Sequence, residues 1–235
     1  MFRYDEQLLE TFPTIRAGII HATNLTNVPS PPPLLDAYRA EQAAAAARLK
    51  ETPVAEVASI GAWRRAFSQF GVKPTQYRVA AEALLRRIAK QGDIPSINSL
   101  VDIGNLISIR YAMPVAVFDQ ATIAPPTTVR FARGDELFTD LGSRDAGPIN
   151  PEPGEVVFVD TKGVVSARRW CWRQSAQSAT SASTADALFV VEGHHEAAAT
   201  EIDSALTDLE SLLAELQPQS DRTMYRLSPD APAVS

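Results

Sequence analysis

The polar residues best suited to chemistry in this chain lie in residues 98–119, whose sequence is NSLVDIGNLISIRYAMPVAVFD. On a helical wheel, Asn98, Asp102 and Asn105 fall within about 60° of one another. The remaining helix surface is almost entirely apolar, whereas a surface helix normally carries a wide polar face. A buried amide or carboxylate group costs about 1–3 kcal/mol when it has no hydrogen-bond partner. This polar stripe therefore either holds neighbouring backbone or lines a pocket that a ligand fills.

A second conspicuous segment is ARRWCWRQ, residues 167–174, which combines tryptophan with arginine. Interpreted as a strand, it places Trp170 and Trp172 on one face and Arg173 on the other. Tryptophan and arginine together can stack on bases and contact phosphates. The alternative is an amphipathic strand with its tryptophans in the core and its arginines in water or in ion pairs.

Composition excludes several classes of protein. The chain has 235 residues and a net charge of −6, which argues against a protein that grips long nucleic acid without specificity. It contains no run of about 18 apolar residues and no signal-peptide pattern, so we expect a cytoplasmic protein that does not cross a membrane. The one cysteine, Cys171, excludes an internal disulfide, and three histidines are too few for a convincing metal site. We predict no metal and no cofactor, and the oligomeric state is left open.

The order of the elements predicts an α+β fold, with helices packed on mostly antiparallel sheets. We expect a single domain over residues 1–216 and, from its Pro, Ser, Asp and Gln content, a disordered tail over 217–235. The polar stripe is expected on a helix that Ser96 caps and Pro114 ends. The other predicted helices cover 34–50, 54–70, 75–91 and 197–216, and the predicted strands cover 14–25, 115–118, 127–133, 155–160, 163–174 and 186–192.

Several of these segments together resemble the tRNA-editing (B3/B4) domain of the phenylalanyl-tRNA synthetase beta subunit. The resemblance covers roughly residues 14–195, and the chain looks like a freestanding version of that domain. The class II aminoacylation motifs are absent, so we do not expect this chain to charge tRNA. The residues that carry the resemblance are Asn98, Val101-Asp102, Asn105, Pro114, Phe118-Asp119, the segments VRFARGDELFTDLG and PGEVVFVDTKG, and the run TADALFVVE that ends at Glu192.

The resemblance implies hydrolysis of an ester between a wrong amino acid and the terminal ribose of a tRNA, performed in trans. Such a reaction needs a positioned water and groups that hold the ammonium group and the attacked carbonyl. Glu192 is the expected catalytic residue, because it falls at a position that the family uses in its editing pocket. The expected substrate-binding residues are Asn98, Asp102, Asn105, Asp119, Trp170, Trp172 and Arg173. The implied partner is the aminoacylated 3′ end of a tRNA.

Two departures from the family pattern leave the substrate open. Ala116 stands where many synthetase editing domains have a histidine, and GHHEAAATEID replaces the Thr-Asp-Ala segment after the glutamate. The sequence leaves open whether His194 or His195 substitutes in part for that histidine. Asp102, Asn105 and Asp119 equally fit roles in bonding backbone or forming turns. The alternative functions are a non-catalytic module that binds RNA or tRNA ends, and a binder of small amino-acid-like molecules that reuses the pocket.

Overall fold

The computed structural model describes residues 1–142 and 147–235. The fold is α+β, as predicted, and contains two sheets. A four-stranded antiparallel sheet has the order β3-β8-β2-β9, and a six-stranded sheet has the order β10-β1-β4-β5-β6-β7, in which β1 and β4 run parallel. The strands are β1 Phe2–Tyr4, β2 Arg16–Thr23, β3 Val115–Asp119, β4 Thr127–Phe131, β5 Val156–Val159, β6 Val165–Arg168, β7 Arg173–Gln174, β8 Asp186–Gly193, β9 Asp221–Leu227 and β10 Ala233–Val234.

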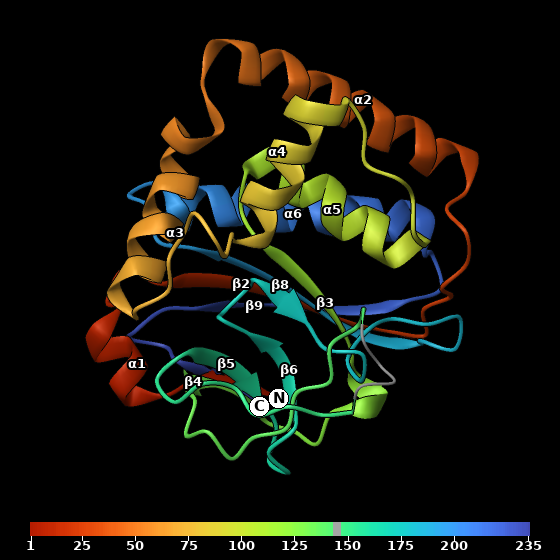
Figure 1. The fold of residues 1–235 in the computed structure, drawn as a ribbon. Coiled ribbons are helices and arrows are strands. Elements are labelled where there is room, and N and C mark those ends of the chain that lie inside the picture. The colour runs from red at the N-terminus through yellow and green to blue at the C-terminus, as the bar shows by residue number, and fades with distance from the viewer. Residues whose placement is uncertain (143–146) are drawn as a thin grey trace.

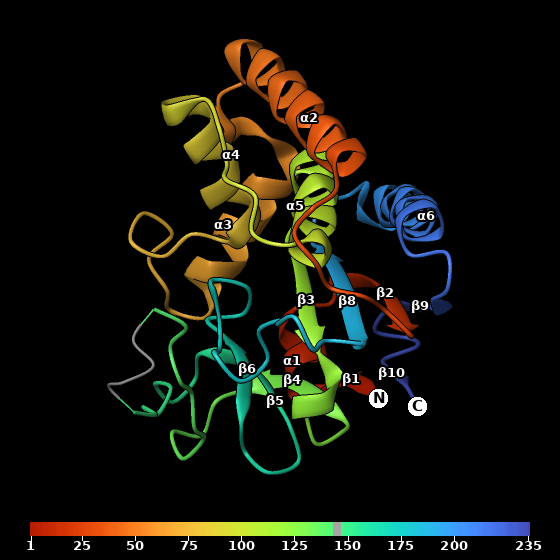
Figure 2. The same cartoon turned by 90° about the vertical axis from the view of Figure 1, so that its right-hand side faces the viewer.

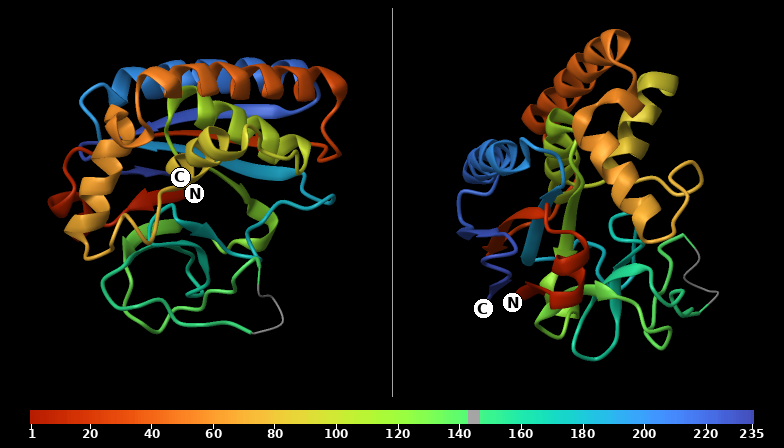
Figure 3. Two further views of the ribbon diagram at one scale, coloured as in Figure 1. Left: turned by 45° about the horizontal axis from the view of Figure 1, so that its top comes forward. Right: turned by 90° about the vertical axis from the view of Figure 1, so that its left-hand side faces the viewer.

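Helices cover one face of the four-stranded sheet, and the six-stranded sheet lies on its other side (Figures 1 and 2). Helices α5 and α6 pack directly on the four-stranded sheet, while α2 and α4 pack on the outer side of α5 (Figure 3). The helices are α1 Glu6–Thr11, α2 Pro32–Glu51, α3 Ala58–Gln69, α4 Ala80–Gln91, α5 Ser99–Tyr111 and α6 Ala198–Leu216, with short 3-10 helices η1 Val54–Glu56 and η2 Gln120–Thr122.

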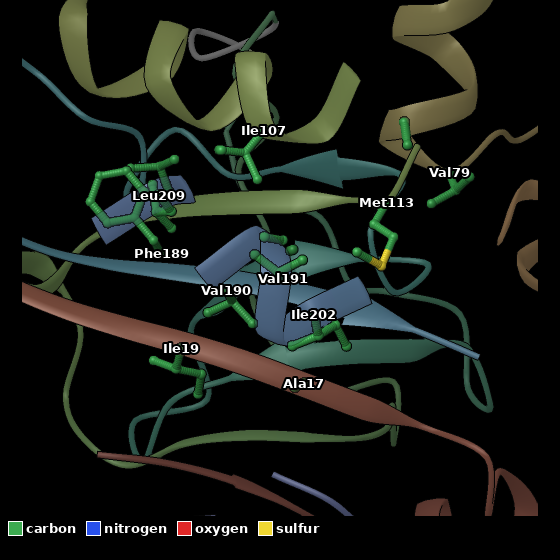
Figure 4. Packing of buried hydrophobic residues seen from close by; sticks show 14 of the residues in the cluster. Ala17, Ile19, Val79, Ile107, Met113, Phe189, Val190, Val191, Ile202 and Leu209 are labelled. Carbon is green, nitrogen blue, oxygen red and sulfur yellow. The ribbon is translucent and has the colours of Figure 1, made fainter. Parts of the chain in front are cut away.

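Helix α6 is amphipathic because its leucines recur at helical spacing, and its apolar face packs on β2 and β8. Figure 4 shows Phe189, Val191, Ile202 and Leu209 among the buried residues of this region. Gly18 of β2 permits the close approach, since a Cβ there would lie 2.6 Å from the side chain of Ile202. The helix layer is therefore fixed firmly to this face of the sheet.

The predicted disordered tail is wrong. Strand β9 pairs along β2 from Ala17↔Leu227 to Thr23↔Asp221, and β10 pairs with β1. The amino group of Met1 also donates to the carbonyl oxygen of Val234, at 2.9 Å. An edge strand gains its backbone hydrogen bonds from its neighbour and needs few apolar residues of its own, so composition alone did not reveal these strands.

The close packing of α5 on β3 gives a stability prediction. A Cβ on Gly104 would lie 2.6 Å from Cγ2 of Val117, whereas a Cβ on Gly61 of α3 would meet its nearest atom at 3.6 Å. Gly104→Ala is expected to lower the free energy of unfolding by about 1–2 kcal/mol, because overpacking outweighs the better helix propensity. Gly61→Ala is the matched control and is expected to raise it by about 0.5–1 kcal/mol. Urea unfolding measures both, and equal effects of the two substitutions would contradict the packing described.

Candidate functional site

Glu192 lies near the end of β8 and is buried between the two sheets, with 2% of its surface exposed. Its Oε1 accepts hydrogen bonds from the hydroxyl of Tyr4, at 2.6 Å, and from Nε1 of Trp170, at 3.0 Å. Tyr4 comes from β1 of the six-stranded sheet, and Trp170 comes from the loop between β6 and β7. Both donors use the same oxygen, so within the described residues Oε2 accepts no hydrogen bond.

Burial makes this carboxyl group unusual. Burial raises the pKa of Glu192 from its ordinary value to about 7, and the hydrogen bonds from Trp170 and Tyr4 offset part of that rise. Burial and the neighbouring Glu192 also raise the pKa of Tyr4 well above its usual value, so Tyr4 remains a hydroxyl donor. A carboxyl group that titrates near neutral pH can act as a general base or acid under physiological conditions.

Aromatic rings enclose the other side of Trp170. Its ring lies edge-on against Phe12 and Trp63, with centroids 5.1 Å apart in each pair, and 4.9 Å from the imidazole of His194. Burial lowers the pKa of His194 to about 3, so this imidazole is neutral at pH 7. Its Nδ1 lies 3.4 Å from Oγ1 of Thr14, and its buried Nε2 has no partner among the described residues. Glu192 and His194 thus lie at the same end of β8, and the side chains of both contact the indole of Trp170.

The polar stripe of α5 holds backbone and loops together. Asn98, rather than the expected Ser96, caps the helix, and its side-chain oxygen accepts from the backbone N–H of Val101 at 3.0 Å. Asp102 is fully buried and accepts hydrogen bonds from Ser30 Oγ at 2.6 Å, from the backbone N–H of Ile97 at 3.0 Å and from Ser96 Oγ. Asn105 is half-buried beside the Tyr38 hydroxyl. These contacts fit the structural alternative that the sequence left open for the stripe.

The structure does not bring this stripe and Glu192 together. Gly18 and Val191 form a cross-strand pair, and Gly18 faces α6, so the side chain of Glu192, the next residue after Val191, lies on the opposite face of the sheet. Helix α5 lies on the same face as α6. The side chain of Asn98 also contacts Thr180, which precedes the first residue of β8, Asp186, whereas Glu192 lies near the last residue of that strand. The expectation that the stripe and Glu192 share one pocket is therefore corrected.

Asp119 also lies far from Glu192. It pairs with Ala187, five residues before Glu192 on β8, which corresponds to a separation of about 16 Å along the strand. Its carboxylate accepts from Thr184 Oγ1 at 2.6 Å and from the backbone N–H of Ala121 at 3.0 Å. Asp119 therefore stabilises a turn. Ala116, in contrast, pairs with Val190 on the same face as Glu192, so the position of the family's histidine does border this site.

The segment 167–174 is not one strand. Arg169 and Trp170 have positive φ angles of 45° and 59°, which end β6 and turn the chain into a hairpin loop. Trp170 is consequently fully buried against Glu192, while Trp172 is half-buried and lies edge-on to Tyr77, with centroids 4.9 Å apart. The expected common face for Trp170 and Trp172 is wrong, because strand alternation does not extend through this turn.

Arg173 lies at the surface beside Trp172. Its guanidinium carbon is 4.8 Å from the centre of the Trp172 ring, and its Nη1 lies 2.7 Å from a carboxylate oxygen of Asp140. A surface cleft of about 320 Å³ is lined there by Gln76, Arg78, Ala83, Arg86, Trp172 and Arg173. The loop between β6 and β7 thus connects the buried carboxyl group to a basic and aromatic surface.

Sequence reasoning missed three contributors to this site, Tyr4, Phe12 and Trp63. Tyr4 lies in an N-terminal strand and Phe12 directly follows an N-terminal helix, and neither element was predicted. The Asp5 side chain caps that helix by accepting from the backbone N–H of Gln7, and this N-cap pattern was the available signal. Within the described residues, no three His, Cys, Asp or Glu side chains are grouped to hold a metal ion. The described helices also include none with the length and hydropathy that a membrane crossing requires.

The chain has similarity to known proteins at the level of one family model and of solved structures. The chain matches a solved N-terminal fragment of the phenylalanyl-tRNA synthetase beta subunit from Pyrococcus horikoshii, with 12% sequence identity and a TM-score of 0.49. That match covers 96% of this chain and 53% of the fragment, so the chain spans about half the fragment's length. No curated protein matches the chain significantly. The family model of the B3/4 domain matches residues 62–211, which is more than half of the chain. The chain belongs to the B3/4 domain family.

Proposed function

We propose that this protein binds the aminoacylated 3′ end of a tRNA and hydrolyses mischarged ester bonds in trans. The observation that carries the proposal is the buried carboxyl group of Glu192, whose pKa is about 7 and whose Oε2 accepts no hydrogen bond within the described residues. A base with a pKa near the working pH is the most effective proton acceptor at that pH. The resemblance of the sequence to the synthetase editing domain also implies a role for Glu192 in an editing pocket, which supports the proposal.

In the proposed reaction, ionised Glu192 accepts a proton from a water molecule. The water oxygen attacks the ester carbonyl, the bond to the ribose oxygen breaks, and the proton passes to that leaving oxygen. Trp170 and Tyr4 both donate hydrogen bonds to Oε1 of Glu192, and the side chain of Trp170 fills the space beside that oxygen. Substrate entry therefore requires the loop between β6 and β7 to move. Asn98, Asp102, Asn105 and Asp119 have no part in this proposed site, since they lie at the other end or on the other face of the sheet.

The basic and aromatic surface beside the loop supports contact with tRNA. Arg78, Arg86 and Arg173 gather around the cleft that Trp172 lines. Guanidinium groups bind phosphates, and an indole ring can stack on an unpaired base. A local basic surface of this kind suits a short RNA end better than a long duplex, which agrees with a net charge of −6.

A specific observation favours a second candidate, a non-catalytic module that binds tRNA ends. Glu192 already has two protein donors, and Trp170 is fully buried against it, which is the geometry of a closed structural site. In that case the loop would stay in place, and only the surface around Trp172 would contact RNA.

The deciding experiment incubates the purified protein with a panel of mischarged tRNAs and measures binding and deacylation in the same samples. We expect at least one mischarged tRNA to be bound and deacylated. Binding without deacylation across the panel would contradict the hydrolase and favour the binding module. An absence of both would contradict both candidates.

A further inference from the structure

The two hydrogen-bond donors to Oε1 of Glu192 differ in how firmly the fold holds them. Trp170 comes from the loop between β6 and β7, where it and Arg169 both have positive φ angles. That conformation is unfavourable for residues other than glycine. The proposed hydrolysis requires this loop to move before a substrate can enter. The hydrogen bond from Trp170 to Oε1 is therefore lost in the state that holds a substrate.

Tyr4, the other donor, belongs to a strand that has a neighbour on each side. Strand β1 lies between β10 and β4 in the six-stranded sheet, and Tyr4 pairs with Val129 of β4. Its backbone N–H donates to the carbonyl oxygen of Pro232 at 2.9 Å. The Tyr4 ring is buried and lies edge-on to Phe2, with centroids 5.6 Å apart. The hydroxyl of Tyr4 thus stays beside Glu192 when the loop moves.

The groups around Glu192 leave Tyr4 without a charged competitor in the part of the chain that the structure describes. The cross-strand neighbour of Glu192 on β2 is Ala17, which carries no charge. Burial and the neighbouring Glu192 raise the pKa of the Cys171 thiol well above its usual value, so this thiol of the loop is neutral at pH 7. His194, on the same strand as Glu192, is also neutral at pH 7.

We propose that Tyr4 is a positioning residue for the hydrolysis. Its hydroxyl holds Oε1 of Glu192 after the loop has moved, which leaves Oε2 to take the proton from the attacking water. That proton then passes to the leaving ribose oxygen. The inference rests on the proposed function and adds the group that determines which oxygen acts as the base. Tyr4 lies outside residues 62–211, which match the B3/4 family model, so this group is a contribution of the chain beyond that model.

The test uses Tyr4→Phe, which deletes the hydroxyl and keeps the ring. A hydrogen bond to the ionised form of a carboxyl group favours that form, so its loss disfavours ionisation. We expect the titration midpoint of Glu192 to rise by about one pH unit, the effect of losing one hydrogen bond to a charged group. Carbon-13 NMR of the full chain, labelled at the glutamate carboxyl carbons, measures the midpoint. The spectrum of Glu192→Gln identifies the signal.

Tyr111→Phe is the matched control, because it deletes a hydroxyl that donates to the carboxylate of Asp208 at 2.8 Å on the helix side of the molecule. It should leave the midpoint of Glu192 unchanged. An unchanged midpoint in folded Tyr4→Phe would overturn the proposal.

A measurement on the wild type applies even if Tyr4→Phe fails to fold. The ring carbon that bears the hydroxyl is labelled in every tyrosine, and its NMR signals are followed with pH. One signal should follow the titration of Glu192 in the wild type and stay constant in Glu192→Gln. The absence of such a signal would overturn the proposal.

The kinetic test separates positioning from a merely structural role. For a mischarged tRNA that the wild type cleaves, Tyr4→Phe should lower the single-turnover rate at pH 6 by about tenfold and raise the midpoint of the pH profile by about one pH unit. A structural role would lower the rate by the same factor at every pH, and that result would overturn the proposal. Cleavage of no mischarged tRNA by the wild type would instead contradict the proposed function, and the role of Tyr4 in hydrolysis with it, whatever the NMR titrations show.

Discussion

Replacing Trp170 with alanine is expected to lower the free energy of unfolding by about 3–5 kcal/mol. Trp170 has no exposed surface and packs edge-on against Phe12, Trp63 and His194. The substitution would leave a cavity between the two sheets and remove one of the two donors to Glu192. Urea unfolding followed by circular dichroism measures the loss.

Trp172→Ala is the matched control, because it makes the same change two residues further along the chain. Trp172 is half-buried, and its contacts are with Tyr77 and the guanidinium groups of Arg169 and Arg173. Its loss is expected to cost about 1–2 kcal/mol, since less apolar surface leaves the core. If the two tryptophans shared one face of a strand, the two costs would be similar. Such a result would contradict the hairpin loop described above.

Glu192→Gln is expected to raise stability at pH 8 by an amount on the order of 3 kcal/mol and to change it little at pH 4.5. The pKa of Glu192 is about 7 in the folded protein and 4.5 at its ordinary value, so the folded state binds the proton more tightly. The unfolded chain releases that proton at lower pH, and the wild type therefore loses stability as pH rises from about 4.5 to about 7. Glutamine carries no charge and removes this dependence.

Two features make the measurement specific. The lowered pKa of His194, about 3, has the opposite effect, with stability lost as pH falls from 6.5 toward 3. The wild type and Glu192→Gln both contain His194, so its contribution cancels in the difference between them.

Glu82→Gln is the control, because Glu82 is equally buried but pairs with Arg64 and Arg86 at 2.8 Å. That variant should lose stability at pH 8, since two guanidinium groups lose a charged partner. A Glu192→Gln variant that is less stable than the wild type at pH 8 would contradict the raised pKa of Glu192.

The elements with high intrinsic propensity or a clear amphipathic pattern were predictable from the sequence. The helices Pro32–Glu51 and Ala198–Leu216 and the strand Asp186–Gly193 all lie close to their predicted positions. The N-terminal strand and helix and the strand Asp221–Leu227 were not predicted, because short edge elements depend on backbone pairing with distant strands. The turn at Arg169 and Trp170 was also missed. Two consecutive non-glycine residues with positive φ angles leave no pattern in the sequence.

The candidate site was predictable only in part. The sequence pattern correctly indicated that Asp102 is buried and hydrogen-bonded, but its partners Ser30 and Ile97 come from segments that spacing on a helix cannot identify. Glu192 was singled out by resemblance, since a glutamate at a strand end is ordinarily solvated. Its contacts with Tyr4 and Trp170 depend on how two sheets pack against each other, which lies beyond any local pattern.

The central claim is that Glu192 activates water for ester hydrolysis, and the most direct test is the pH dependence of single-turnover deacylation. For a mischarged tRNA that the protein cleaves, we expect the rate to rise about tenfold per pH unit below the pKa of Glu192, about 7, and to level off above it. Glu192→Gln should lower the rate at pH 8 by about 10²–10⁴-fold while tRNA affinity stays within about twofold of the wild type. A Glu192→Gln variant with the wild-type rate and the wild-type pH profile would contradict the account.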